Sequence, residues 1–171
     1  MFGDVSRRFG ACSFWTAIVL CWVLGCSSES ADLNAVFGTK QVLDVVKRAE
    51  RVEAFRLAPE SFNKRSLAEY DIVGDPVPVS EADAEALAAI LTDPATYKFD
   101  IAKGCDPEYG VGVRFLAGNE KVTVLFCFEC DILTVYRGDA AVGGEDFDPA
   151  RGRLVALVQR VFPDDEELRE L

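Results

Sequence analysis

The sequence contains no histidine among its 171 residues, and this absence excludes several kinds of chemistry. Without an imidazole, the chain has no Ser-His or Cys-His nucleophilic catalysis, no histidine metal ligands and no histidine proton shuttle. No Gly-x-Ser-x-Gly elbow, phosphate-binding loop or complete dinucleotide-binding glycine motif is present either. The sequence therefore predicts a protein that is not an enzyme.

Basic residues are also scarce. Lys and Arg total 18 against 29 Asp and Glu, so the formal net charge is −11 and the pI is about 4.5. Nucleic acids need a basic face to neutralise their phosphates, which argues against a nucleic-acid partner. The apolar content of 50% is too high for a disordered chain. The length leaves room for one domain and a leader.

The first 25 residues have the pattern of an export leader. Arg7 and Arg8 precede a run without charge, residues 9–25, which is shorter than the roughly 20 residues that span a bilayer. A basic start followed by an apolar stretch is typical of a signal peptide. The run ends in Val23-Leu24-Gly25-Cys26, which resembles the lipobox of bacterial lipoprotein signal peptides.

This resemblance implies that Cys26 receives a diacylglyceryl group, that residues 1–25 are removed, and that the new amino terminus is acylated with a chain such as palmitate. The membrane would then hold the protein through covalent lipid, and no other cofactor is expected. Ser27 after the cysteine implies delivery to the outer membrane, facing the periplasm, if the cell is Gram-negative. An uncleaved single-span anchor and an ordinary cleaved secretory signal are the alternatives.

The remaining chain is expected to have two parts: the lipidated Cys26 with a polar tether through residue 38, and one α+β domain over residues 39–171. Helical periodicity begins at Thr39. Ser80 to Asp83 matches a capping box before a second helix. Asp148-Pro149 is expected to cap a third helix.

Alternating or continuous apolar residues predict strands between these helices. The expected strands cover residues 52–57, 70–73, 111–117, 122–128 and 132–136. The fourth is apolar on both faces, which predicts a central strand with cover on each side. Pro76 and Pro78 are expected to interrupt the chain, and Gly143-Gly144 to mark a loop. The result is a small antiparallel β meander packed with about three helices.

The domain contains three cysteines. Cys105 begins a Cys-x-Pro-x-x-Gly stretch, and Cys127 and Cys130 form Cys-Phe-Glu-Cys. This part is similar to small uncharacterised exported bacterial proteins that carry the same two elements, a resemblance that implies no activity. An exported compartment favours a disulfide, either from Cys105 to Cys127 or Cys130, or between Cys127 and Cys130. One thiol is left over in each case.

Three other states of these cysteines stay open. All three thiols could be buried and reduced. Cys105, Cys127 and Cys130 could bind zinc together with Asp106, Glu129 or Asp131. A thiol–disulfide couple is the last alternative, although carboxylates beside a thiol raise its pKa. The sequence thus predicts a membrane-tethered envelope lipoprotein that binds an unknown partner, with a zinc or thiol–disulfide protein as the alternative.

Overall fold

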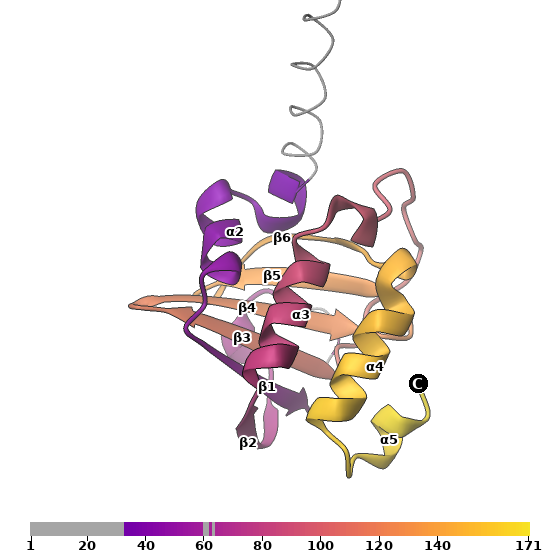
Figure 1. Ribbon diagram of the computed structural model, residues 1–171. Coiled ribbons are helices and arrows are strands. Elements are labelled where there is room, and N and C mark those ends of the chain that lie inside the picture. The colour runs from indigo at the N-terminus through magenta and orange to yellow at the C-terminus, as the bar shows by residue number, and fades with distance from the viewer. Residues whose placement is uncertain (1–32, 60–61, 63) are drawn as a thin grey trace, which may run out of the picture.

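The computed structural model describes residues 33–59, 62 and 64–171 of the chain (Figure 1). The leader, the lipobox and Cys26 lie outside the described residues. Six antiparallel strands form one sheet in the order β2-β1-β3-β4-β5-β6. They are β1 (Arg51–Leu57), β2 (Ile72–Pro78), β3 (Val111–Ala117), β4 (Glu120–Cys127), β5 (Ile132–Arg137) and β6 (Ala140–Asp146). The small α+β fold with an antiparallel meander is therefore confirmed.

The helices lie on one face of this sheet (Figure 1). They are α2 (Lys40–Lys47), α3 (Glu81–Leu91), α4 (Arg151–Val161) and the short α5 (Glu166–Arg169). Thr39 begins α2, since its side chain accepts a hydrogen bond from the Val42 amide. Ser80 begins α3 in the same way, through the Asp83 amide. Both starts agree with the sequence prediction, because each follows from local capping chemistry.

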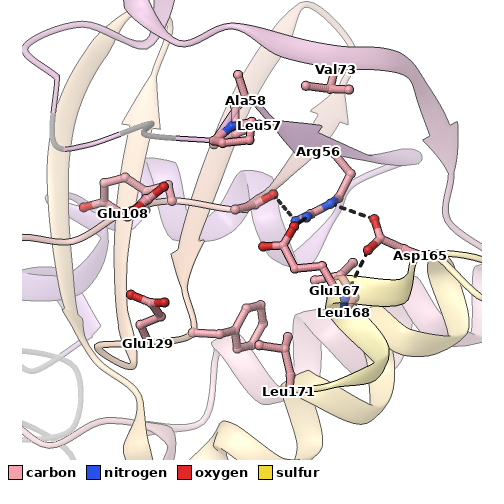
Figure 2. A pocket seen from close by; sticks show the side chains of 14 residues that line it. Arg56, Leu57, Ala58, Val73, Glu108, Glu129, Asp165, Glu167, Leu168 and Leu171 are labelled. Atoms are coloured by element: carbon pink, nitrogen blue, oxygen red, sulfur yellow. Dashed lines mark hydrogen bonds and ion pairs between the residues drawn. The ribbon is translucent and has the colours of Figure 1, made fainter.

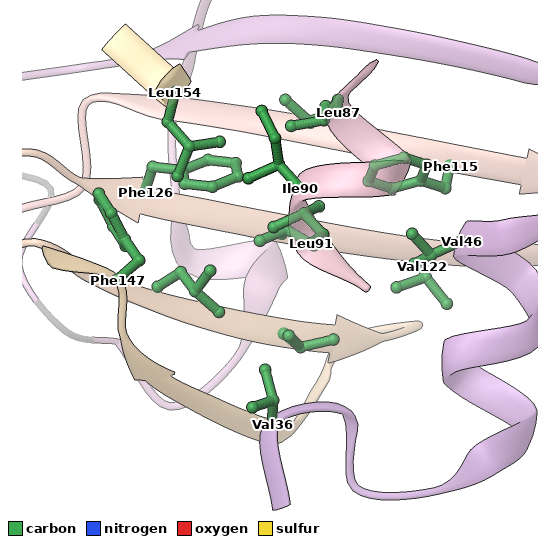
Figure 3. Close-up of a cluster of buried hydrophobic side chains, with 14 of the residues drawn as sticks. Val36, Val46, Leu87, Ile90, Leu91, Phe115, Val122, Phe126, Phe147 and Leu154 are labelled. Atoms are coloured by element: carbon green, nitrogen blue, oxygen red, sulfur yellow. The ribbon is translucent and has the colours of Figure 1, made fainter. Parts of the chain in front are cut away.

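The main core lies between the helices and the sheet (Figure 3). Leu87 and Leu91 of α3 and Leu154 of α4 are almost fully buried there. They pack in one cluster with β3 and β4 side chains that include Phe115 and Phe126. The helical spacing of the apolar residues thus places each helix on the sheet.

A second, smaller apolar cluster covers the opposite face of the sheet. It comprises Phe55, Leu57, Tyr70, Tyr109, Leu125, Cys127, Cys130 and Tyr136. Tyr70 and Tyr109 come from the segments that precede β2 and β3, and their rings meet edge to face with centroids 5.8 Å apart. Side chains of β4 take part in both clusters, so β4 is covered on both faces. The sequence predicted this cover, because β4 is apolar at successive positions.

The sheet differs from the sequence prediction in two ways: β2 extends further than expected, and a sixth strand follows β5. β2 continues through Pro76 and Pro78, which is possible because β2 is an edge strand and an edge N–H needs no partner within the sheet. Gly143-Gly144 belongs to a sixth strand, β6, and is not a loop. A Cβ at Gly143 would fall 2.2 Å from the Val36 carbonyl oxygen. The glycine therefore permits close approach of two backbones.

The domain begins earlier than expected. Leu33, Val36 and Phe37 are buried in the main core, so these residues belong to the domain and not to a tether that runs to residue 38.

The start of α4 also differs from the expectation. Asp148 does not cap α4 directly: it is the first residue of the 3₁₀ turn η4 (Asp148–Ala150), and α4 follows without a side-chain cap. Within the described part of the chain, no helix has the length and apolar character to cross a membrane.

Candidate binding site

A cavity of about 510 Å³ opens between the sheet and α5 (Figure 2). The end of β1, the start of β2, the segment before β3 and the β4–β5 turn form its walls together with α5. Its lining residues are Arg56, Leu57, Ala58, Pro59, Val73, Glu108, Tyr109, Gly110, Phe128, Glu129, Asp165, Glu167, Leu168 and Leu171. The cavity size is that of a site for a small ligand or a few side chains.

Arg56 lies at the centre of one wall (Figure 2). Its Nε lies 2.8 Å from Asp165 Oδ2, its Nη2 lies 2.6 Å from Glu167 Oε2, and its Nη1 donates to the Gly110 carbonyl oxygen at 2.5 Å. Asp165 also accepts a hydrogen bond from the Leu168 amide and so begins α5. Arg56 therefore holds α5 over the end of the sheet and fixes one side of the cavity.

The cavity combines apolar side chains with acidic ones. Val73 of β2 and Phe128 of the β4–β5 turn both line it, and Val73 is 52% exposed. Glu129, which is exposed, brings a further carboxylate to a site in which Arg56 is already paired with two acids. An arrangement of this kind favours a positively charged group that carries apolar atoms.

Two of the cysteines lie at the β4–β5 turn, residues 128–131: Cys127 is the last residue of β4, and Cys130 lies within the turn. The structure joins Cys105 to Cys130 in a disulfide with Cα atoms 6.2 Å apart, and Cys127 is a buried free thiol. The Cys127 sulfur accepts a long hydrogen bond of 3.4 Å from the Cys130 amide. The sequence left three disulfide pairings open. The structure contains the Cys105–Cys130 pairing, which joins the exposed segment before β3 to the β4–β5 turn.

Two basic side chains hold the same turn. Arg151 of α4 donates to the Phe128 carbonyl oxygen and pairs with Asp131. Lys103 donates to the Cys130 carbonyl oxygen at 2.6 Å. Asp131 has a positive φ of 55°, a conformation that aspartate tolerates better than most residues. The turn that carries Phe128 and Glu129 into the cavity is therefore fixed on several sides.

Lys103 also bridges two carboxylates. Its Nζ lies 2.7 Å from Asp146 Oδ2 and 2.5 Å from Asp148 Oδ2. Burial raises the pKa of Asp146, whereas hydrogen bonds from Asp146 and Lys103 lower the pKa of Asp148 to about 2. Partial burial opposes protonation of Lys103, but its hydrogen bonds to the two carboxylates raise its pKa. This cluster anchors the segment before β3 to the end of β6.

Tyr109 is the cavity residue with a shifted pKa. Burial raises the pKa of its phenol to about 12, and its hydroxyl lies 2.6 Å from Thr134 Oγ1. The phenol is neutral at pH 7 and takes part in a contact beneath the sheet. The groups that line the cavity thus provide apolar contact and negative charge.

Cys105 and Cys130 have no thiolate to offer to zinc in this state, because both are in the disulfide. In the described ranges, no group of three or more Cys, Asp or Glu lies in an arrangement that could hold a metal ion. The zinc and thiol–disulfide alternatives stay predictions, which alkylation of the thiols tests.

Comparison with known proteins gives one match. No family model matches the chain, and no curated protein matches it. A crystal structure described as "Putative Lipoprotein from Clostridium perfringens" is similar over 77% of this chain and 97% of its own, with 16% sequence identity and a TM-score of 0.47. A similarity at this level carries no argument about what either protein does.

The sequence prediction did not identify Arg56 or α5 as parts of a site. Arg56 has the same strand parity as Val52 and Ala54, whose side chains are buried in the main core. A charged residue at an inward position of a strand is a usable signal. Asp165 and Glu167 belong to an acidic run near the end of the sequence, residues 164–167, and only the fold brings them to Arg56.

Proposed function

We propose that this chain is a lipid-anchored protein of the cell envelope whose domain binds another molecule and performs no chemistry on it. One observation carries the proposal: Val23-Leu24-Gly25-Cys26 resembles a lipobox, and the folded core begins only seven residues after the cysteine, at Leu33. In a Gram-negative cell the domain would face the periplasm from the outer membrane.

Covalent lipid would supply the membrane affinity. The domain is strongly acidic, so an anionic lipid surface repels it. One acyl chain binds a membrane only marginally, whereas two or more give stable anchoring. A diacylglyceryl group together with an amide-linked chain on Cys26 meets this requirement.

Expression of the full-length chain in bacteria that are fed labelled palmitate tests the anchor. The wild-type protein should incorporate the label and fractionate with membranes, and Cys26→Ser should lose both properties. Cys21→Ser is the matched control, because it removes a thiol from the leader and leaves the lipobox intact. Equal label in the wild type and in Cys26→Ser would overturn lipidation at this residue.

The cavity beside the β4–β5 turn is the proposed binding surface. Its carboxylates and apolar walls match an extended partner segment in which a lysine or arginine stands next to apolar residues. Val73, at the start of edge strand β2, lines the cavity and is exposed. We therefore assign a cationic, partly apolar peptide segment as the class of ligand.

Two synthetic peptides test this assignment, one that alternates Lys with Leu and one that alternates Glu with Leu. The purified protein should bind the cationic peptide saturably, and Glu129→Lys should weaken binding about tenfold through repulsion in the cavity. Glu50→Lys makes the same charge change at an exposed residue before β1 and should leave binding unchanged. Equal binding of the two peptides, or an equal effect of the two variants, would contradict the assignment.

A further inference from the structure

Two exposed apolar side chains lie on the loop that follows the 3₁₀ turn η3 (Pro94–Thr96). Phe99 is 38% exposed and Ile101 is 41% exposed. The Tyr97 ring contacts the Phe99 ring, with centroids 5.8 Å apart. The Lys98 amide donates to the Asp146 carbonyl oxygen at 3.0 Å, and this bond attaches the loop to the end of β6.

The same edge of the sheet receives the start of the domain. The backbone of Ala35 and Val36 lies against Gly143 of β6, and Ile101 lines a shallow hollow together with Gly143. The start of the described chain (indigo) and the loop after η3 accordingly lie at the upper edge of the molecule in Figure 1, whereas β2 and α5 lie at the lower edge.

The length of chain before Leu33 limits how far the domain can lie from its anchor. Leu33 follows Cys26 by seven positions, and even a fully extended stretch of this length spans at most about 25 Å. A domain of this size has a radius of gyration of about 14 Å, so it is wider than its tether is long. The edge at which the chain enters the domain therefore faces the membrane.

We infer that Phe99 and Ile101 contact the bilayer interface and orient the lipid-anchored domain, so that the cavity and β2 face away from the membrane. The inference rests on the proposed lipid anchor. Interfacial segments bury apolar side chains at the boundary between headgroups and acyl chains, and exposed apolar side chains at a fixed membrane-facing edge meet this condition.

Tryptophan fluorescence tests the contact directly. Trp15 and Trp22 are the two tryptophans of the chain, and both precede Cys26, so the processed protein contains none. Phe99→Trp therefore places a single reporter on the loop. Ile72→Trp is the matched control, because Ile72 is exposed to a similar extent, 42%, on the opposite edge of the sheet. Both variants are expressed with the full leader and purified as lipoproteins.

The purified variants are placed in phosphatidylcholine vesicles with bromine on the acyl chains, a zwitterionic lipid that does not repel the acidic domain. The reporter in Phe99→Trp should lose roughly half of its fluorescence to bromine, since interfacial side chains lie about 5–10 Å into the headgroup and acyl boundary. The reporter in Ile72→Trp should stay unquenched and accessible to aqueous acrylamide.

Three results would overturn the contact. If the protein floats with the vesicles but the Phe99→Trp reporter is not quenched by bromine, the lipid anchor stands and the loop contact is wrong. Protection of the same reporter from acrylamide without bromine quenching would assign the patch to a contact between copies of this protein, because the vesicles contain no other protein. Failure of the protein to float with vesicles would remove the lipid anchor, and the membrane contact with it.

Discussion

Arg56 Nε lies 2.8 Å from Asp165 Oδ2, and this ion pair joins the first strand of the sheet to the helix that closes the cavity. Both side chains are largely buried, at 15% and 22% exposed. The pair therefore differs from the surface ion pairs of the domain, which contribute little to stability.

Arg56→Ala should lower the free energy of unfolding by about 2 kcal/mol, because two carboxylates and the Gly110 carbonyl oxygen lose a charged donor. Arg48→Ala is the control. Arg48 pairs with Glu120 on the surface and is 61% exposed, so its loss should cost less than about 1 kcal/mol. Urea unfolding measures both values, and equal losses would show that Arg56 does not hold α5.

The cysteines predict a definite labelling result. When the processed protein is purified without reductant and alkylated after denaturation, its intact mass should show one added label, and peptide mapping should place it on Cys127. Three labels would show that all three thiols were free or bound to metal, and zinc analysis would follow. Reduction of the disulfide should cost about 3 kcal/mol, as expected for a loop of this length.

Substitution by alanine should change the stability of the domain in opposite directions at two glycines, Gly112 and Gly152. At Gly112 a Cβ would fall 2.2 Å from the Phe55 ring, so Gly112→Ala should destabilise the domain by about 1–3 kcal/mol, and Phe55→Leu should restore part of the loss. Gly152 lies on α4 with open space around it, so Gly152→Ala should stabilise by about 0.5–1 kcal/mol. Thermal unfolding compares them, and a loss at both positions would contradict the packing around these two glycines.

The Lys103 cluster predicts the pH dependence of stability in acid. The pKa of Asp148 is lowered to about 2 in the folded protein, so the folded state releases this proton more readily than the unfolded state. Its contribution is present above about pH 4, the carboxyl pKa of an unfolded chain, and is lost as the pH falls toward 2.

Asp146 acts in the opposite direction, because burial raises its pKa and the folded state retains its proton. Its contribution therefore falls as the pH rises above about 4. Asp148→Asn should flatten the rise of stability between about pH 2 and pH 4, measured by urea unfolding across this range. An unchanged slope would show that Lys103 does not hold Asp148 ionised.

The sequence predicted those features of the fold that depend on local patterns. The caps at Thr39 and Ser80, the apolar stripes of the helices and the doubly covered strand β4 each depend on residues that are close in the chain. Strand β6 was missed, because its glycine pair at residues 143–144 reads as a loop until the backbone of residues 35–36 is placed against it.

The candidate site was less predictable for the same reason. Glu129 was considered as a zinc ligand and not as the wall of a cavity, and Arg56 was not considered. The cavity requires five segments that are separated in sequence: the end of β1, the start of β2, the segment before β3, the β4–β5 turn and α5. No local pattern indicates which acidic residues of so acidic a chain meet a particular arginine.

The two outer strands of the sheet affect how readily neighbouring copies of the protein could pair through their strands. The backbone of residues 35–36 packs on the face of β6 at Gly143 and so leaves the outer edge of β6 aside, whereas Pro76 and Pro78 remove two amide donors from the second half of the edge strand β2. Exposed edges invite strand pairing between neighbouring molecules, and proteins confined to a membrane plane meet their copies often. Under the proposed lipid anchor, half of the β2 edge cannot donate to a neighbouring strand, which lowers the tendency of neighbouring domains to join through β2 into a continuous sheet.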